Sequence, residues 1–536
     1  MPVVSNFRNT VSRAWPGPLA GLVAGLCALA VAELVAGLLR PAAGPVTVVG
    51  GAVIDRTPAA VKDFAIRTFG ENDKTVLQIG ILAVLALLAL VAGAVALRHR
   101  RASTAGILLF GLVGTVAALS RPDAGPLDVL PSLAGALAGA TALYLLTGKA
   151  RRPAAPVPAV PPEGDAGGDG AGWDRRGFLT ATAVTAGAAA GAGALGRYLG
   201  GRRGQSAVAS RTRLVLPAPA SPAPPVPPAV RAKAPGISPF VTPNRDFYRV
   251  DTALVVPKVH AETWRLRIHG EGVARPRTYT LADLLARPLI ERDITLTCVS
   301  NEVGGPYVGN ARWLGVPLGA LLADCGVRPP SRGGRADQLV ARSVDGMTLG
   351  SPVEDVMDGR DAMLAVGMNG EPLPFEHGFP VRMLVPGLYG YVSACKWIED
   401  IELTTFDVYD PYWVKREWAR RAPIKTQSRI DTPKPFARPS AGPGPVTVAG
   451  VAWAQHRGIS RVQIRVDDGP WNDAELAAQD TVDTWRQWSY RWQAAPGGHT
   501  LTVRATDGTG RVQTERRTRT VPDGASGWHS VFVTVT

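Results

Sequence analysis

The sequence DITLTCVSNEVGG, residues 293–305, places a cysteine at the point where a strand pattern ends. Residues 293–297 alternate polar and apolar side chains, which is typical of a half-buried strand. Cys298 follows directly and leads into a loop rich in Asn and Gly. Such a cysteine can present a thiolate, and soft thiolate ligands suit metals that change redox state. These residues alone leave two alternatives, a metal ligand or a buried structural cysteine.

From about residue 236 onward, strand-like segments alternate with turn residues and charged residues, which is the pattern of a folded domain. Residues 264–269 (WRLRIH) alternate like a strand, and Gly270 closes it. Residues 281–285 (LADLL) predict a short helical turn. We therefore expect an α+β domain over residues 236–432.

Three separated stretches resemble the sulfite oxidase-like molybdopterin family. They are TLTCVSNEVGG (295–305), GNARWLGVPLGALL (309–322) and MNGEPLPFEHGFPVRMLVPGLYGYVSACKWI (368–398). They follow one another in the family's order, and the similarity spans about 240–430. The resemblance implies a molybdopterin-dependent oxidoreductase that transfers oxygen atoms through two-electron chemistry at molybdenum.

The resemblance also implies roles for single residues. Cys298 matches the thiolate ligand of molybdenum, and His377 and Arg382 match positions that hold the pterin and its phosphate. A planar guanidinium suits that role because it can grip phosphate with two parallel hydrogen bonds. Lys396 matches another cofactor-binding position, with Ala394 and Cys395 beside it.

The segment NRDFYR, residues 244–249, resembles the one that opens the cofactor pocket. Tyr248 is expected to bind the cofactor there, and Arg249 is expected beside the metal, where it would attract a small anionic substrate. The animal-type sulfite oxidases have Arg-Asn-His at this point, whereas this chain has RVD at 249–251, which leaves the substrate open. Asp345 matches a catalytic position near the metal, although Asp345-Gly346 is equally an ordinary turn.

The remaining cysteines and histidines point to no second metal centre. Cys27, Cys298, Cys325 and Cys395 form no C-x-x-C pair, so we expect neither an iron–sulfur cluster nor a zinc site, and no C-x-x-C-H motif attaches haem. Cys325 is expected in the core. His260 and His269 are expected at the surface or on a strand, since no further ligand lies at a suitable spacing.

Residues 1–147 predict a four-helix transmembrane region. Apolar stretches cover residues 17–39, 75–97, 102–120 and 126–147, each close to the roughly 20 residues that a membrane-crossing helix needs. Basic residues flank the outer ends of this region and the loop at 98–101, which favours a cytoplasmic position for those segments. The first 259 residues contain one histidine, His99, in a loop, so the helices are expected to be an anchor or a partner-binding module rather than a haem relay.

Residues 148–235 predict linkers around one further apolar segment, at about 174–197. DRRGFL at 174–179 followed by a Gly- and Ala-rich run resembles a twin-arginine export signal, and the alternative is a fifth transmembrane helix. Either places the catalytic domain on the extracytoplasmic side of the cytoplasmic membrane. Whether the segment is cleaved stays open. A Pro-rich connector at 216–230 is expected to be extended.

The tail, residues 440–536, predicts an immunoglobulin-like β-sandwich. Residues 462–466 form a strand pattern before the turn sequence DDG, and HTLTVRATDGTGRV at 499–512 repeats that pattern. In the resembling family such a domain often makes a homodimer, which is therefore possible here. The whole chain is then a helical membrane bundle, an α+β domain and a β-sandwich.

The leading functional hypothesis is oxygen-atom transfer on a small sulfur oxyanion such as sulfite. Electrons would pass to an external carrier, a cytochrome or a quinone-linked protein. A sulfoxide-type reductase on the same scaffold is one alternative, and a membrane scaffold protein without cofactor is another. Nucleic-acid binding is not expected despite the net charge of +14, because the basic residues are scattered.

Overall fold

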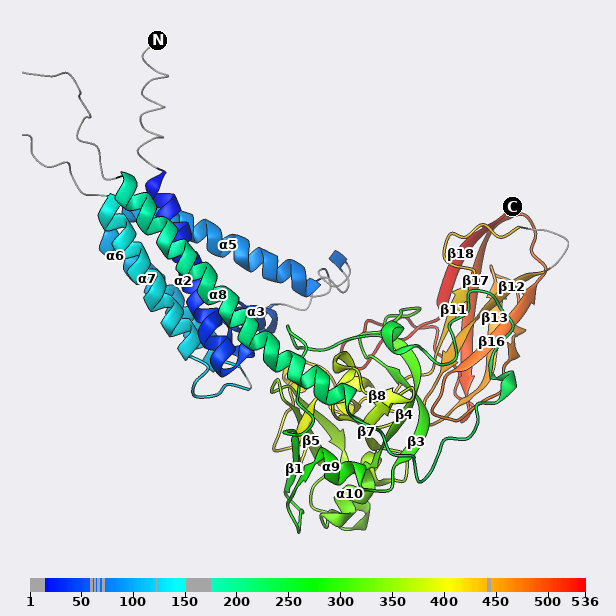
Figure 1. Cartoon of the computed structure of the whole chain (residues 1–536). Coiled ribbons are helices and arrows are strands. Elements are labelled where there is room, and N and C mark those ends of the chain that lie inside the picture. The colour runs from blue at the N-terminus through cyan, green and yellow to red at the C-terminus, as the bar shows by residue number, and fades with distance from the viewer. Residues whose placement is uncertain are drawn as a thin grey trace, which may run out of the picture. The chain divides into compact units, whose positions relative to one another are not determined.

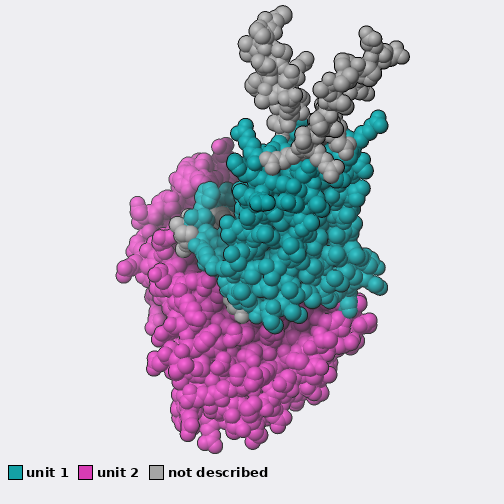
Figure 2. Space-filling view, turned by 90° about the vertical axis from the view of Figure 1, so that its left-hand side faces the viewer, with its two compact units in different colours: residues 1–206, 253–255 teal, residues 207–252, 256–536 magenta. Residues whose placement is uncertain are grey.

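The computed structural model describes residues 15–57, 73–121, 123–150, 175–440 and 445–536, together with residues 61, 64, 68 and 69. The chain divides into two compact units, shown in two colours in Figure 2. The first unit comprises residues 1–206 and 253–255, and the second comprises residues 207–252 and 256–536. Most of the linker that the sequence predicts at 148–173, residues 151–173, lies outside the described residues.

The first unit is helical (Figure 1). Five of its helices are long and apolar enough to cross a membrane, and they include all four predicted spans. The helices are α2 (Pro16–Leu39), α3 (Pro45–Arg56), α5 (Asp73–Ala96), α6 (Arg100–Leu119), α7 (Leu130–Ala150) and α8 (Arg175–Thr212). Their apolar side chains are largely exposed in the chain by itself, among them Leu87, Leu109 and Leu137. Exposed apolar side chains of this kind are compatible with insertion into a membrane.

Small residues let these helices pack closely. A Cβ atom on Gly21 of α2 would lie 2.0 Å from the carbonyl oxygen of Ala89, and one on Gly93 of α5 would lie 2.1 Å from the carbonyl oxygen of Gly17. Backbone contact of this kind is a common means of association between helices in lipid. Glycines on α2 and α5 therefore let the backbones of these two helices come into contact.

Helix α8 extends beyond the segment at 174–197 that the sequence predicts. It continues to Thr212, and its residues 207–212 belong to the second unit. There Arg211 Nε donates to the Leu373 carbonyl at 2.7 Å, and the Ser210 hydroxyl accepts from Ala261 N at 3.2 Å. These contacts stabilise the final turn, residues 207–212, through partners far along the chain.

Two sheets build the middle of the second unit. Its elements are β1 (Arg265–Gly270), β2 (Arg277–Thr280), α9 (Leu281–Leu285), β3 (Ile290–Thr297), β4 (Val308–Pro317), α10 (Leu318–Asp324), β5 (Gln338–Ser343), β6 (Thr348–Pro352), α11 (Val353–Met357), β7 (Met363–Met368), β8 (Glu371–Pro372), β9 (Arg382–Leu384), α12 (Gly390–Ser393) and β10 (Ile398–Thr404). One sheet has the order β2-β1-β10-β5-β6 and the other β3-β4-β7-β8, with β9 paired to β7. The expected strand at 264–269 and helical turn at 281–285 are both present.

Local sequence explains several of these elements. In β1, Leu266 and Ile268 are buried while Arg265 and Arg267 are exposed, which is the alternation of a strand with one face on the core. Helix α9 begins with a capping box, in which the Thr280 hydroxyl accepts from Asp283 N and the Asp283 carboxylate accepts from Thr280 N.

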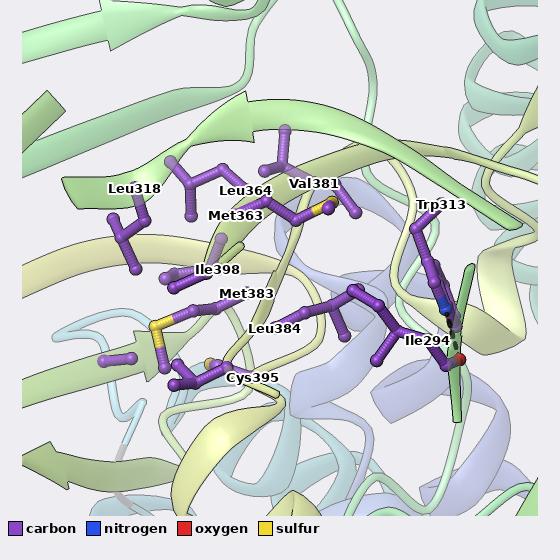
Figure 3. Close-up of a cluster of buried hydrophobic side chains, with 14 of the residues drawn as sticks. Ile294, Trp313, Leu318, Met363, Leu364, Val381, Met383, Leu384, Cys395 and Ile398 are labelled. Atoms are coloured by element: carbon purple, nitrogen blue, oxygen red, sulfur yellow. Dashed lines mark hydrogen bonds between the residues drawn. The ribbon is translucent and has the colours of Figure 1, made fainter. Parts of the chain in front are cut away.

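One hydrophobic core underlies both sheets (Figure 3). Trp313 on β4 is fully buried, and its indole N–H donates to the Ile294 carbonyl on β3 at 3.1 Å. Met383 of β9 and Ile398 of β10 pack in the same cluster. A buried polar group normally requires such a partner, so this bond fixes the large ring against the strand that ends at Cys298.

The C-terminal part of the second unit consists of two further sheets. Their strands are β11 (Gln427–Thr432), β12 (Val446–Trp453), β13 (Ile459–Val466), β14 (Asn472–Asp473), β15 (Glu475–Leu476), β16 (Arg486–Trp492), β17 (Gly497–Asp507) and β18 (His529–Val535). The orders are β11-β12-β16-β15 and β14-β13-β17-β18, and side chains of both sheets share one core. Because β11 pairs with β12, this part begins earlier than the expected residue 440.

The connector expected to be extended, residues 216–230, ends in a 3-10 helix, Pro228–Val230, and is held by hydrogen bonds. Ser221 forms a parallel bridge with Ile290 at the start of β3, where Ser221 N donates to the Leu289 carbonyl at 3.1 Å. Ala478 N donates to the Ala229 carbonyl at 2.9 Å. The connector therefore stabilises the edge of the sheet that carries Cys298.

Candidate functional site

Cys298 lies at the start of the loop between β3 and β4. Its backbone N–H donates to the Tyr307 carbonyl at 3.0 Å, which closes the loop at its base. The side-chain oxygen of Asn301 accepts from Tyr307 N at 2.8 Å, and Asn301 N donates to the Cys298 carbonyl at 3.1 Å. Asn301 in the loop after the strand thus supplies bonds that fix the backbone of the segment that carries the thiol.

The Cys298 thiol lines a cavity in the second unit and is 9% exposed. Burial raises its pKa, while hydrogen bonds from Ser300 and the nearby charge of Lys396 act in the opposite direction. A buried thiol that is approached by donors and by a cation is suited to become a thiolate when a metal binds it.

His377 is held in one orientation beside this cavity. It ends a 3-10 turn, Phe375–His377, and its Nε2 lies 3.0 Å from the Asn244 carbonyl oxygen. Because a carbonyl only accepts, Nε2 carries the proton and Nδ1 is left as an acceptor. Burial lowers the pKa of His377 to about 4, so the ring is neutral at neutral pH and can accept a hydrogen bond from a ligand.

Arg382, at the start of β9, carries a buried charge without a carboxylate. Its Nη1 donates to the His377 carbonyl at 3.3 Å, and its Nε has no hydrogen-bond partner among the residues that the structure describes. Burial lowers its pKa to about 10. A buried guanidinium with an unused N–H group is costly unless an anion binds it, and a phosphate fits this requirement.

Lys396 and Arg249 share one carboxylate oxygen. Asp251 Oδ2 accepts from Lys396 Nζ at 2.7 Å and from Arg249 Nε at 2.9 Å, and the Asp251 side chain is 3% exposed. Burial lowers the pKa of Lys396 to about 8, although the charge of Asp251 opposes this shift. Lys396 Nζ also donates to the Glu376 carbonyl at 3.2 Å. Asp251 therefore determines where both cations lie.

The structure brings together most, but not all, of the site residues expected from the sequence. Those that line the cavity are Tyr248, Cys298, Asp345, His377, Arg382, Ala394 and Lys396. Arg249 and Cys395 are not among the described lining residues. The Cys395 side chain instead lies fully buried in the core (Figure 3), and burial raises the pKa of its thiol.

Asp345 is both a turn residue and a cavity residue. It lies in the hairpin between β5 and β6, where its Oδ1 accepts from Met347 N at 3.4 Å. Its Oδ2 accepts from the Thr252 hydroxyl at 3.3 Å, and both side chains line the cavity. The two alternatives that the sequence leaves open for Asp345 are therefore compatible.

Sequence reasoning missed the aromatic wall of the cavity. Tyr391, Trp413 and Trp418 line it, with ring centroids 5.5 Å apart for Tyr391–Trp418 and 6.2 Å apart for Trp413–Trp418. The Tyr391 hydroxyl donates to the Ala419 carbonyl at 2.7 Å. The spacing of aromatic residues after β10 was visible in the sequence, but aromatic residues line cores more often than pockets.

The cavity fits a thiolate-ligated cofactor with a phosphate. It offers one thiol, one neutral histidine with a free acceptor and one buried guanidinium with an unused N–H group. Among the described residues no group of three or more His, Cys, Asp or Glu side chains could hold a metal ion without further ligands.

Comparison with known proteins gives one matching family model and several similar proteins. Residues 253–413 match the family model of the oxidoreductase molybdopterin-binding domain. Over 344 residues the chain is 29% identical to the mitochondrial sulfite oxidase of Mus musculus, which covers 55% of this chain and 62% of that protein. It is 30% identical over 292 residues to the sulfite oxidase of Gallus gallus, covering 47% of this chain and 62% of that protein.

Each of these relatives is matched over only part of its own length. The chain spans 62% of the length of the mouse protein and 56% of the length of the mitochondrial sulfite oxidase of Drosophila melanogaster. The solved structure of the sulfane dehydrogenase SoxCD from Paracoccus pantotrophus is 26% identical, with a TM-score of 0.49, and the alignment covers 58% of this chain and 84% of that one.

Proposed function

Because this chain is a sulfite oxidase-like molybdopterin oxidoreductase, we propose that it transfers an oxygen atom to or from a small sulfur compound at the cavity around Cys298. The observation that supports this most directly is the buried Arg382, whose Nε lacks a partner beside the same cavity. The sulfur oxyanion sulfite is the first substrate candidate. Its oxidation consumes one water and yields sulfate, two protons and two electrons, which pass to an external acceptor such as a cytochrome or a quinone-linked protein.

Each cavity residue has a defined part in this proposal. When bound, the molybdenum cofactor supplies the two-electron redox chemistry and the site of oxygen transfer. Cys298 holds the metal through its thiolate, and Arg382 binds the phosphate of the pterin. His377 accepts a hydrogen bond from the pterin at Nδ1. Tyr248 stays protonated because burial raises its pKa, so it can donate a hydrogen bond into the cavity.

The proposal is tested by producing the full chain in a host that makes the cofactor. Molybdenum is measured in the purified protein, sulfite is added, and reduction of the metal is followed by electron paramagnetic resonance. We expect a metal-loaded protein whose reduction by sulfite is lost in Cys298→Ser. The matched control is Cys325→Ser, since Cys325 is also buried but is not among the described cavity residues.

Two outcomes would contradict the proposal in different ways. A stable protein that contains no molybdenum would favour a scaffold protein instead. A loaded protein that sulfite does not reduce would exclude sulfite as the substrate while leaving the cofactor in place.

Sulfoxide reduction is the second candidate, and the two carboxylates in the cavity favour it. Asp251 and Asp345 both line the space that a substrate would enter, and a sulfoxide carries no charge that they would repel. In this direction the sulfur–oxygen bond breaks, and the sulfoxide takes up two electrons and two protons to give a thioether and water. The electrons would come from a reduced external carrier of the same kinds.

The proposal extends to location and assembly. The five apolar helices would anchor the chain in the cytoplasmic membrane, with the second unit on the extracytoplasmic side. An immunoglobulin-like arrangement of the C-terminal sheets would suit a homodimer, which sedimentation of the detergent-solubilised chain would detect.

A further inference from the structure

Two cationic side chains near the cavity share a counter-ion within the protein. Lys396 and Arg249 both donate to the same oxygen of Asp251, at 2.7 and 2.9 Å. Among the described lining residues the basic side chains are Arg382 and Lys396, and the carboxylates are those of Asp251 and Asp345. If Arg382 binds the cofactor phosphate, the remaining groups give a substrate no net positive charge to bind.

The aromatic wall of the cavity also favours a substrate of low charge. The Tyr391 hydroxyl donates to the Ala419 carbonyl at 2.7 Å, and the Trp397 indole N–H donates to the Phe375 carbonyl at 2.8 Å. Both rings line the cavity with their polar groups already bonded to the backbone, so they offer apolar surface. Trp413 and Trp418 extend this surface.

We infer that Asp251 is a specificity-determining residue. It acts as an internal counter-ion for Lys396 and Arg249, so that the cavity accepts a substrate of low net charge, such as an uncharged organic sulfoxide, in preference to a dianion. This inference rests on the proposed function in one respect, because it takes the cavity at Cys298 to be where the substrate enters. Replacing the carboxylate by an amide of the same shape would remove the negative charge that Lys396 and Arg249 share, and so favour an external anion.

Sulfate is a suitable probe because it is a dianion of the size of sulfite and is not oxidised further. Its binding to the full chain in detergent is measured by equilibrium dialysis, for the unaltered protein and for Asp251→Asn. We expect Asp251→Asn to bind sulfate at least ~10-fold more tightly, with an affinity that falls more steeply as salt is added. Binding of dimethyl sulfoxide should change much less.

The chain offers a closely matched control in Asp431→Asn. Asp431 accepts from Arg429 Nε at 2.7 Å, two residues earlier in the chain, just as Asp251 accepts from Arg249, and its side chain is also 3% exposed. It is not among the described cavity residues. Its substitution should remove a comparable buried carboxylate without changing sulfate binding.

Equal or weaker sulfate binding by Asp251→Asn would overturn the inference. If that variant does not fold, the unaltered chain still decides, because sulfate binding in the micromolar range at the cavity would also overturn it. Molybdenum content of the same samples separates the two proposals. Metal-free protein would contradict the proposed function, while loaded protein with unchanged sulfate binding would contradict only the role of Asp251.

Discussion

At the scale of single residues, Arg382 carries a buried charge whose described contacts are the His377 carbonyl and the Trp313 ring. No carboxylate lies within ion-pair distance of its guanidinium among the described residues, and the side chain is 6% exposed. Burying a charge without a carboxylate partner costs several kcal/mol, so we expect Arg382 to lower the stability of the cofactor-free protein. The charge of Arg382 is therefore expected to act in opposite directions on folding and on cofactor binding.

We therefore expect Arg382→Met to have two opposite effects. The cofactor-free protein should gain about 1–3 kcal/mol in unfolding free energy, because a buried unpaired charge is removed. Molybdenum content should fall at least ~10-fold, because the phosphate loses its guanidinium. Thermal unfolding of the cofactor-free protein and metal analysis of the loaded protein measure the two effects.

Arg457→Met is the contrasting control. Arg457 Nε lies 2.9 Å from Asp507 Oδ2, and the Asp507 side chain is fully buried, so the substitution leaves a buried carboxylate unpaired. It should lower the unfolding free energy by about 3 kcal/mol. If both methionine variants destabilised the protein equally, the interpretation of Arg382 as a ligand-binding charge would be wrong.

His529 on β18 predicts a pH dependence of stability. Its Nδ1 accepts from Ile430 N at 3.0 Å, and burial lowers its pKa to about 4. Above its ordinary pKa of about 6.5 the ring is neutral in both states. Between pH 6.5 and 4 only the unfolded chain takes up the proton, so the unfolding free energy falls by up to about 3 kcal/mol across this range.

His529→Asn should reduce this loss, because an amide oxygen can accept from Ile430 N and does not titrate. Chemical denaturation between pH 7 and pH 4, for the unaltered chain and the variant, measures the difference. The same slope in both would show that His529 does not bind a proton on unfolding.

Part of the site could be predicted at this scale and part could not. Cys298, His377 and Arg382 were identified because each lies in a stretch that resembles a known family. Asp251 was visible in the sequence but received no role, because its two partners, Arg249 and Lys396, lie 2 and 145 positions away. A contact between distant positions follows from the fold and not from a local pattern.

At the scale of elements, the loop after β3 depends on a glycine. Gly304 has φ +80°, and a Cβ atom there would lie 2.2 Å from the His529 ring. Gly333 has nearly the same backbone conformation, φ +78°, but nothing lies within 4 Å of a Cβ atom at that position. The two positions therefore separate backbone strain from steric overlap.

We expect Gly333→Ala to cost about 1 kcal/mol, which is the effect of the backbone alone. Gly304→Ala should cost about 3 kcal/mol, because the methyl group also displaces the His529 ring. Displacement of this loop should also lower molybdenum content, since Cys298 begins it. Thermal unfolding and metal analysis of both variants test this, and equal effects would rule out a steric role for His529.

Local sequence predicts an element when the polar and apolar pattern that defines it repeats within that element. The strand before Cys298 and the apolar helices of the first unit are examples. Helix α8 extends beyond its predicted end because its last turn is held by Arg211 and Ser210, which contact residues far along the chain. β11 was assigned to the preceding domain because its pairing with β12 is not encoded within residues 427–432.

At the scale of the whole molecule, the helices and the charges between them constrain the topology. Helix α3 has 12 residues, about 18 Å at 1.5 Å per residue, and is too short to cross the hydrocarbon core. If all five longer helices cross the membrane, as proposed, the chain crosses it an odd number of times. Basic residues at 98–101 favour a cytoplasmic loop between α5 and α6, and this fixes the expected side of every other segment.

Cysteine labelling in intact cells tests this topology. His99 is exposed in the loop between α5 and α6, and Val215, which follows α8, is 84% exposed. With α6, α7 and α8 as three successive spans between them, the two positions must lie on opposite sides of the membrane. A membrane-impermeant maleimide should therefore label Val215→Cys but not His99→Cys. The unaltered chain should give little background, because Cys298, Cys325 and Cys395 are buried and Cys27 lies within α2. Labelling of both positions would contradict three spans between them. Labelling of His99→Cys alone would reverse the orientation and contradict an extracytoplasmic site of catalysis.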